Sequence, residues 1–133
     1  HLCDRRQRQM CIRDSICVMR DLFQALSELE SQLVEKYGIS LNEAMVLCSV
    51  GEDKVAASGI VERTGLTASH ASKVIGSVEK KGYLLRHLGE KDKRQMYFTL
   101  TDEARRCLDA VKSKGVDIPE ALQPLFMGKE QSA

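Results

Sequence analysis

The sequence of 133 residues has no tryptophan, few aromatic residues (5%), only two prolines and no long apolar run. A membrane-spanning helix needs about 20 consecutive apolar residues, so no transmembrane segment is predicted. The five cysteines are irregularly spaced, and neither CxxC nor CxC occurs, which argues against a disulfide framework or a zinc site. Because no secretory apolar segment precedes the domain, we expect a reducing, cytoplasmic location.

The sequence also lacks the usual catalytic motifs. None of its histidines, His1, His70 and His87, lies in a recognisable Ser or Cys nucleophile motif. There is no glycine-rich phosphate loop and no HExxH, and no grouping of Cys, His and Asp indicates a metal sensor. We therefore expect no enzyme activity, no cofactor and no bound metal.

What the chain does have is an uneven distribution of charge. The formal net charge is only +1, but residues 67–97 contain seven basic and three acidic groups, whereas residues 16–66 contain four basic and eight acidic groups. A chain that is nearly neutral in total and polarised in this way is expected to present one positive face.

Apolar periodicity predicts a mainly α-helical domain that begins with a long helix over residues 16–36. Its apolar stripe has the three- and four-residue spacing of a helix face and consists of Met19, Leu22, Leu26, Leu29 and Leu33. The stripe can pack on the domain's own core or form a seam with a second chain, and the sequence leaves both possibilities open.

Three shorter helices are predicted next. Ser40 and Glu43 form a capping box, and the following helix is expected to bury Leu41, Ala44, Met45 and Cys48. A helix over residues 58–64 ends at Gly65. Thr67 then caps a fourth helix that runs to Lys81, and Leu66 before it is expected to be buried. Two short helices joined by TGLT are typical of a helix-turn-helix.

A β-hairpin is predicted to follow the helix-turn-helix directly. Residues 83–88 and 96–100 alternate like strands and flank a basic loop over residues 89–95. Thr101 caps a fifth helix that is expected to bury Ala104, Cys107, Leu108 and Val111. A last short helix contains Ile118, Leu122, Leu125 and Phe126, and residues 128–133 are expected to be a frayed tail.

The fourth helix has one face suited to the DNA major groove. Its apolar stripe of Ala71, Val74, Ile75 and Val78 should hold it to the core, leaving small, polar and basic residues outside. Short hydroxyl side chains allow close approach, and Lys or His can donate to phosphates and base edges. The predicted DNA contacts are Thr67, Ser69, His70, Ser72, Lys73, Lys80 and Lys81, of which Lys80 or Lys81 and the cap residue would contact phosphate.

The basic loop of the hairpin is interpreted as a wing that contacts DNA. Lys91, Lys93 and Arg94 lie at its predicted tip, where an arginine can enter the negative potential of the minor groove. Asp92 would repel DNA, so we expect it to pair with a nearby arginine and fix the loop. A solvated charged hairpin is the alternative for this loop alone.

These features resemble the MarR-type winged helix-turn-helix transcriptional regulators. The run DKRQMYFTLTDEA is similar to the family's wing signature, with Asp92, Arg94, Leu100 and Thr101 at the matching positions, and LTASHASKVIGSVEKKGYLLR is similar to its recognition helix. The resemblance covers residues 16–126. It implies a homodimer joined by its terminal helices that binds a palindromic operator, usually as a repressor, and responds to a small lipophilic or phenolic effector or to an oxidant.

The sequence leaves two alternative functions open, and it also leaves open the origin of residues 1–15. Cys17 at the start of the first helix is the only candidate for a redox sensor, since Cys48 and Cys107 fall on apolar stripes and are interpreted as core residues. A winged helix can also serve as a protein–protein interaction module. Residues 1–15 resemble translated sequencing-adapter read-through, or alternatively a disordered basic arm, so the winged-helix domain is assigned to residues 16–127.

Overall fold

The computed structural model describes residues 12–126 of the chain. The described residues divide into two compact units, one formed by residues 33–115 and the other by residues 12–32 together with 116–126. The prediction for residues 1–15 falls mostly outside the described part, although the first helix, α1 (Ile12–Tyr37), begins four residues before the expected start. Three other subjects of the predictions also lie outside the described residues, namely Cys3, Cys11 and the expected tail at 128–133.

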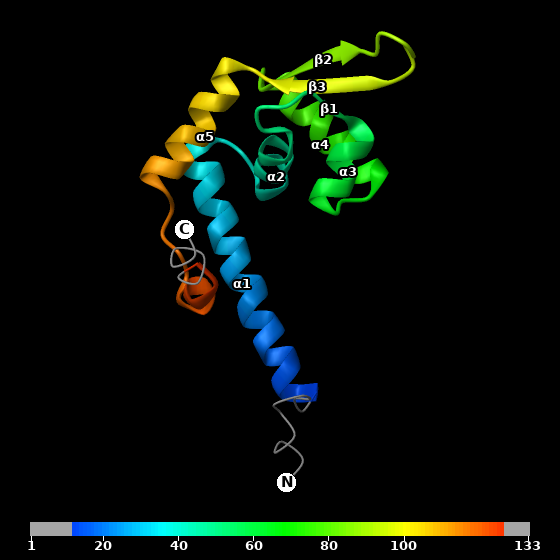
Figure 1. Ribbon diagram of the computed structural model, residues 1–133. Helices are drawn as coiled ribbons and strands as arrows, with labels where there is room; N and C mark the ends of the chain where they lie inside the picture. The colour runs from blue at the N-terminus through cyan, green and yellow to red at the C-terminus, as the bar shows by residue number, and fades with distance from the viewer. Residues whose placement is uncertain (1–11, 127–133) are drawn as a thin grey trace. The chain divides into compact units, whose positions relative to one another are not determined.

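The 33–115 unit consists of helices packed against one side of a small antiparallel sheet (Figure 1). Its elements, after the end of α1, are α2 (Leu41–Val50), β1 (Val55–Ala56), α3 (Ala57–Thr64), α4 (Ala68–Lys80), β2 (Leu84–Leu88), β3 (Met96–Leu100) and α5 (Asp102–Lys114). The strand order is β1-β3-β2, with β3 in the centre. The predicted mainly α fold with a hairpin wing is confirmed.

One apolar core joins these helices to the sheet. Its buried members include Val46, Leu47, Ile60, Val78 and Phe98, and the predicted stripe of α4 is buried in full. Burial of this kind stabilises by about 25 cal/mol per Å² of apolar surface removed from water. Leu66 is half-buried against the core rather than fully buried.

The predicted buried face of α2 is wrong. Leu41, Ala44 and Met45 are only half-buried and Cys48 is exposed, whereas the buried side chains are those of Glu43, Val46, Leu47 and Val50. The capping box of Ser40 and Glu43 is present as predicted. The helix instead packs into the core through Val46, Leu47 and Val50, and the Glu43 carboxylate on that side meets partners at the end of α4.

The structure also differs from the prediction at three places where the local sequence pattern is weak. Strand β1 was not predicted, since its two residues are ordered by pairing with Phe98 and Tyr97 of β3. On α5 only Ala104 is fully buried, and Cys107, Leu108 and Val111 are half-buried. The segment after α5 contains a short 3-10 turn, η2 (Glu120–Leu122), and of its expected apolar residues Leu125 and Phe126 are exposed.

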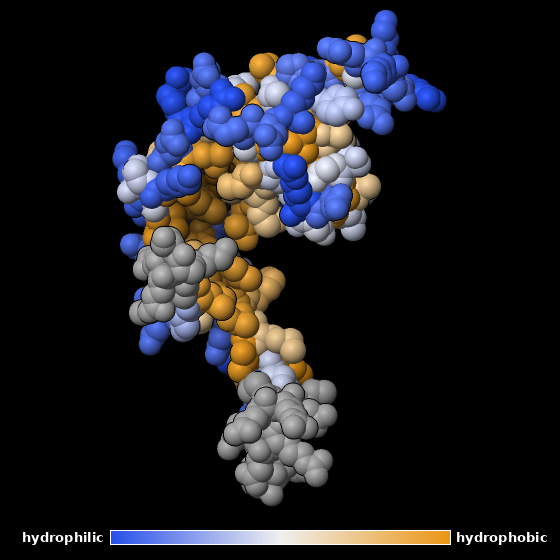
Figure 2. Space-filling model, in the orientation of Figure 1, coloured by the Kyte–Doolittle hydropathy of each residue, from blue (hydrophilic) through white to orange (hydrophobic). Residues whose placement is uncertain are grey.

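The second unit is held by a small cluster of its own. Ala25, Leu29 and Leu122 are buried together, with Val116 and Ile118 against them. The Gln32 amide bonds the Asp117 backbone twice, donating to its carbonyl at 2.8 Å and accepting from its N–H at 2.7 Å. Figure 2 shows hydrophobic residues gathered along α1 in this unit, and the exposed ones are Ile16, Val18, Met19, Leu22, Phe23 and Leu26.

Candidate nucleic-acid interface

The turn from α3 to α4 is fixed by a glycine and a threonine cap. Gly65 ends α3 in the left-handed region at φ 76°, which a residue with a side chain rarely adopts. Thr67 begins α4 and its hydroxyl accepts the backbone N–H of His70 at 3.2 Å. The predicted helix-turn-helix is therefore built, and Thr67 itself is exposed at its corner.

The outward face of α4 carries part of the predicted contact set. Ser69, Ser72, Lys73 and Lys80 are all exposed. A side chain at Gly76 on the same helix would meet no other atom within 4 Å, so the backbone there is open to a close neighbour. His70 is exposed as well, but its ring nitrogen lies 3.5 Å from the Asn42 amide, on the side of α4 that faces α2.

Lys81 is partly exposed, but its ammonium is paired with other groups of the protein. Its ammonium donates to Glu43 Oε1 at 2.7 Å and to the Gly38 carbonyl at 2.8 Å. The other oxygen of Glu43 accepts the Ser77 hydroxyl at 2.6 Å. Burial raises the pKa of Glu43, but hydrogen bonds from Lys81, Ser77 and the Ser40 N–H outweigh it and leave that pKa below its ordinary value. This network ties the end of α4 to the first turn of α2.

The loop from Gly89 to Gln95 forms a tight, basic hairpin end. Gly89 N–H donates to Gln95 O at 2.9 Å, and a Cβ at Gly89 would collide with the Asp92 carbonyl. Asp92 accepts the Arg94 backbone N–H at 3.0 Å and its Nε at 3.2 Å, and these bonds lower the pKa of Asp92. Lys91, Lys93 and Arg94 are exposed, with 91% of the Arg94 side chain open to solvent. Figure 2 shows this end as strongly hydrophilic.

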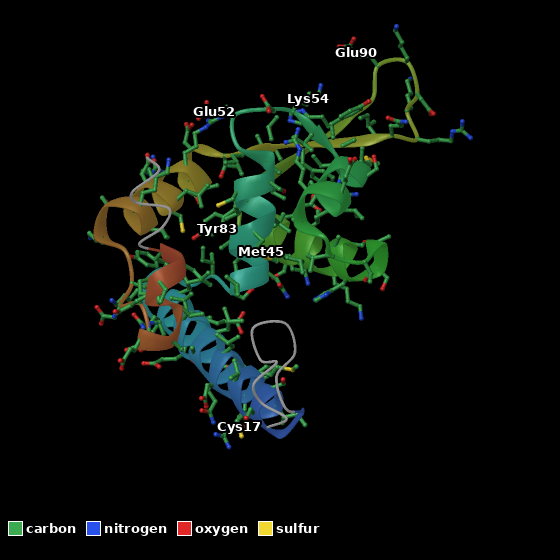
Figure 3. All side chains as sticks on the ribbon, turned by 60° about the horizontal axis from the view of Figure 1, so that its bottom comes forward. Cys17, Met45, Glu52, Lys54, Tyr83 and Glu90 are labelled. Carbon is green, nitrogen blue, oxygen red and sulfur yellow. The ribbon has the colours of Figure 1, made fainter. Side chains whose placement is uncertain are left out.

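One further cation of this surface was missed from the sequence. Lys54, in the turn between α2 and β1, lies over the Tyr97 ring of β3 with its ammonium 5.7 Å from the ring centre. Figure 3 shows Lys54 beside the hairpin and Glu90 at its far end. No local pattern marks Lys54, because only the pairing of β1 with β3 brings the turn to the wing.

The cysteines differ from the prediction, which placed both Cys48 and Cys107 in the core. Cys17 is exposed, Cys107 is half-buried, and Cys48 is exposed rather than in the core. Burial raises the pKa of the Cys107 thiol. Among residues 12–126 no cluster of three or more His, Cys, Asp or Glu is placed to hold a metal ion, and no helix there is long and apolar enough to cross a membrane.

A cleft of about 460 Å³ opens between the end of α2, β3 and α5. Leu100, Leu108 and Val111 supply its apolar lining, and its charged residues are two basic ones, Arg105 and Lys112, and two acidic ones, Glu52 and Asp109. Arg105 donates to Asp102 through Nη1, while its buried Nε has no hydrogen-bond partner among the described residues. A volume of this size is in the usual range of about 300–1,000 Å³ for small-molecule sites.

Comparison with known proteins agrees with this geometry. Residues 40–104 match the family of winged helix DNA-binding domains. No curated protein matches the chain by sequence. Among solved structures, Sco3205, a MarR family transcriptional regulator from Streptomyces coelicolor in complex with DNA, is similar at a TM-score of 0.70 and 22% identity over 93% of this chain and 85% of that one.

Two further structures are similar over nearly the whole chain. Reduced AbfR bound to DNA has a TM-score of 0.71 and 21% identity over 96% of this chain and 94% of its own. BpsR from Bordetella bronchiseptica, whose DNA binding is regulated by 6-hydroxynicotinic acid, has a TM-score of 0.66 and 14% identity over 91% and 99%. Residues 40–104 thus match the family of winged helix DNA-binding domains, and the chain has the fold of these MarR family transcriptional regulators.

Proposed function

We propose that this protein binds double-stranded DNA as a homodimer and represses transcription from a palindromic operator in the cytoplasm. The carrying observation is that two elements of one compact unit, the outward face of α4 and the end of the hairpin, both present exposed cations. In this proposal Ser69, Ser72 and Lys73 enter the major groove and Arg94 enters the minor groove, while Thr67, Lys80, Lys91 and Lys93 contact phosphates.

The contacts of Lys81 and His70 reduce their part in the proposal. Lys81 would have to leave the Glu43 carboxylate to reach a phosphate, and the ring of His70 lies next to Asn42. Lys54 is added as a phosphate contact because it lies beside the hairpin. A protein–protein interaction module needs no such row of cations, which favours DNA.

A salt titration of DNA affinity, read by fluorescence anisotropy, tests this function. Each phosphate contact removed should lower the slope of log affinity against log salt by about 0.9. Lys80→Ala and Lys93→Ala should therefore show a lower slope, and Lys73→Ala and Arg94→Ala, which remove groove contacts, should bind more weakly than the parent. Lys114→Ala, which changes an exposed lysine at the end of α5, is the matched control. A flat salt response of the parent would instead support the interaction module.

The homodimer is supported by the apolar residues that α1 leaves exposed. Phe23 is 72% and Met19 is 63% exposed, and large apolar patches of this kind usually mark an interface. Phe23→Asp should convert a dimer to a monomer in sedimentation experiments, while Gln24→Asp, on the exposed neighbouring position, should not. A parent that is monomeric at micromolar concentration would contradict the proposal.

The cleft between α2, β3 and α5 supports a small phenolic or lipophilic effector. Its apolar lining fits an aromatic ring, and the buried Arg105 Nε, which has no partner among the described residues, can donate to a carboxylate or phenolate even though Glu52 and Asp109 also line the cleft. 6-Hydroxynicotinic acid, which regulates BpsR, is a suitable first probe. If this cleft is the site, the probe should weaken DNA binding by the parent, and Arg105→Gln should abolish that response without changing DNA affinity.

An oxidant is the alternative signal, with Cys17 as its candidate. The Cys17 thiol is exposed on α1, so an oxidant can reach it. Treatment with hydrogen peroxide followed by the anisotropy assay distinguishes the two signals. Redox regulation is favoured if peroxide abolishes DNA binding by the parent and by Cys48→Ser but not by Cys17→Ser.

A further inference from the structure

One ion pair joins the recognition helix directly to the wing. Arg86 on β2 donates through Nε to Glu79 Oε2 at 3.0 Å and through Nη2 to Glu79 Oε1 at 2.6 Å. The two parallel bonds form a planar fork, which fixes direction as well as distance. Glu79 lies in the last turn of α4, so the fork spans from that turn to the first wing strand.

Both partners of the pair lie next to buried residues of the core. Arg86 pairs across the sheet with Phe98, and its guanidinium carbon lies 5.5 Å from the centre of that ring. Phe98 is 2% exposed, and Val78, which precedes Glu79, is fully buried. The side chain of Glu79 is 23% exposed and that of Arg86 is 48% exposed. Movement of the wing relative to α4 would therefore break the fork.

We propose that the Glu79–Arg86 pair is a positioning device that sets the wing against the recognition helix and thereby gives the protein its selectivity for an operator. The inference rests on the proposed DNA-binding function and adds to it a pair that contacts no DNA. Arg86, although counted among the basic groups of the region, has two of its donors committed to Glu79.

The physical reason lies in how binding to a random duplex differs from binding to an operator. Random duplex is bound through phosphate contacts that tolerate small changes of geometry. An operator is read by base edges in the major groove while the wing occupies another groove, so both elements must have their correct separation at once. A protein that is already organised in that geometry loses less conformational freedom on binding. A loosened pair should therefore weaken operator binding more than random binding.

Simple electrostatics predicts the opposite effect on operator affinity when Glu79 is replaced. Removing a carboxylate near the DNA surface should strengthen binding to every duplex. Glu90→Gln is the matched control for that effect, because Glu90 is an exposed acid on the wing loop that has no part in the fork. Electrostatics alone thus predicts that Glu79→Gln and Glu90→Gln behave alike, and positioning predicts that they differ.

The experiment compares an operator, selected by the parent protein from a random duplex pool, with random duplex of the same length. For Glu79→Gln we expect at least tenfold weaker operator binding with random binding unchanged or tighter, so the ratio of the two affinities falls. For Glu90→Gln we expect both affinities to rise together. Thermal melting verifies that each variant is folded, and Arg86→Lys, which keeps the charge but not the fork, serves as the second variant.

The same assay separates positioning from a direct phosphate contact by Arg86. Loss of a phosphate contact in Arg86→Gln would weaken both duplexes equally and lower the salt slope by about 0.9. Positioning predicts an unchanged slope and a lower operator-to-random ratio. If folded Glu79→Gln and Arg86→Lys keep the parent's ratio, the inference is overturned while the DNA-binding function stands. If the parent selects no operator and shows no salt-dependent binding, both are wrong.

Discussion

Replacing Glu43 by glutamine is the most direct test of how α2 holds the recognition helix. The substitution keeps the size of the side chain and removes the charge that faces Lys81. In the parent, Glu43 accepts hydrogen bonds from the Lys81 ammonium, the Ser77 hydroxyl and the Ser40 N–H. Glutamine can still accept at one oxygen, so the loss is mainly that of the ion pair.

The expected loss lies between the values for buried and exposed pairs. The Glu43 side chain is 7% exposed and that of Lys81 is 38% exposed. Breaking a fully buried pair costs about 3–5 kcal/mol, and an exposed pair contributes about 0–1 kcal/mol. Because solvent screens the lysine end, we expect a loss of about 1–2 kcal/mol in the free energy of unfolding.

The loss should depend on pH in one direction. Hydrogen bonds and the charge of Lys81 lower the pKa of Glu43 from its ordinary value of 4.5, so folding favours the ionised form. The stability that this carboxylate contributes is therefore fully present above pH 4.5 and is lost as the pH falls through the lower pKa of the folded state. The difference between parent and Glu43→Gln should be constant between about pH 5.5 and 8 and should shrink at acidic pH.

Urea unfolding at one fixed protein concentration measures this difference. With a slope of about 2 kcal/mol per M, a loss of 1–2 kcal/mol should lower the midpoint by roughly 0.5–1 M. Glu52→Gln is the control, because Glu52 is exposed on the turn after α2 and should change stability by less than about 0.5 kcal/mol. Equal midpoints for the two variants, or a difference that does not shrink in acid, would refute the role assigned to Glu43.

Two glycines give further predictions. Gly76→Ala should stabilise the fold by about 0.5–1 kcal/mol in the same urea assay, because alanine favours a helix and its methyl group meets nothing within 4 Å. It should nevertheless weaken DNA binding if that face enters a groove, and equal affinity would contradict the close approach. Gly89→Ala should distort the wing, since its Cβ would collide with the Asp92 carbonyl, and trypsin should cleave the loop faster than in the parent. Unchanged cleavage would show that the loop accommodates a side chain.

Local patterns in the sequence were sufficient for the elements that carry the interface. Strand β3 has the predicted bounds, the apolar stripe of α4 is the predicted one, and Thr67 and Thr101 cap their helices as expected. Each of these depends on residues within one or two turns of each other, or on alternation along one strand. The helix-turn-helix, the hairpin and the winged-helix fold could therefore be derived from short-range spacing and order alone.

Tertiary structure decided which partners the polar groups choose. On the buried side of α2, Glu43 contacts Ser77 and Lys81, which lie 34 and 38 residues further along the chain. The same long-range pairing engages Lys81, and the pairing of strands places Lys54 beside the wing. Charge and periodicity identify which residues are able to bind DNA. Which of them remain available is decided by contacts between distant segments, because an ion pair forms wherever the folded chain brings its two partners together.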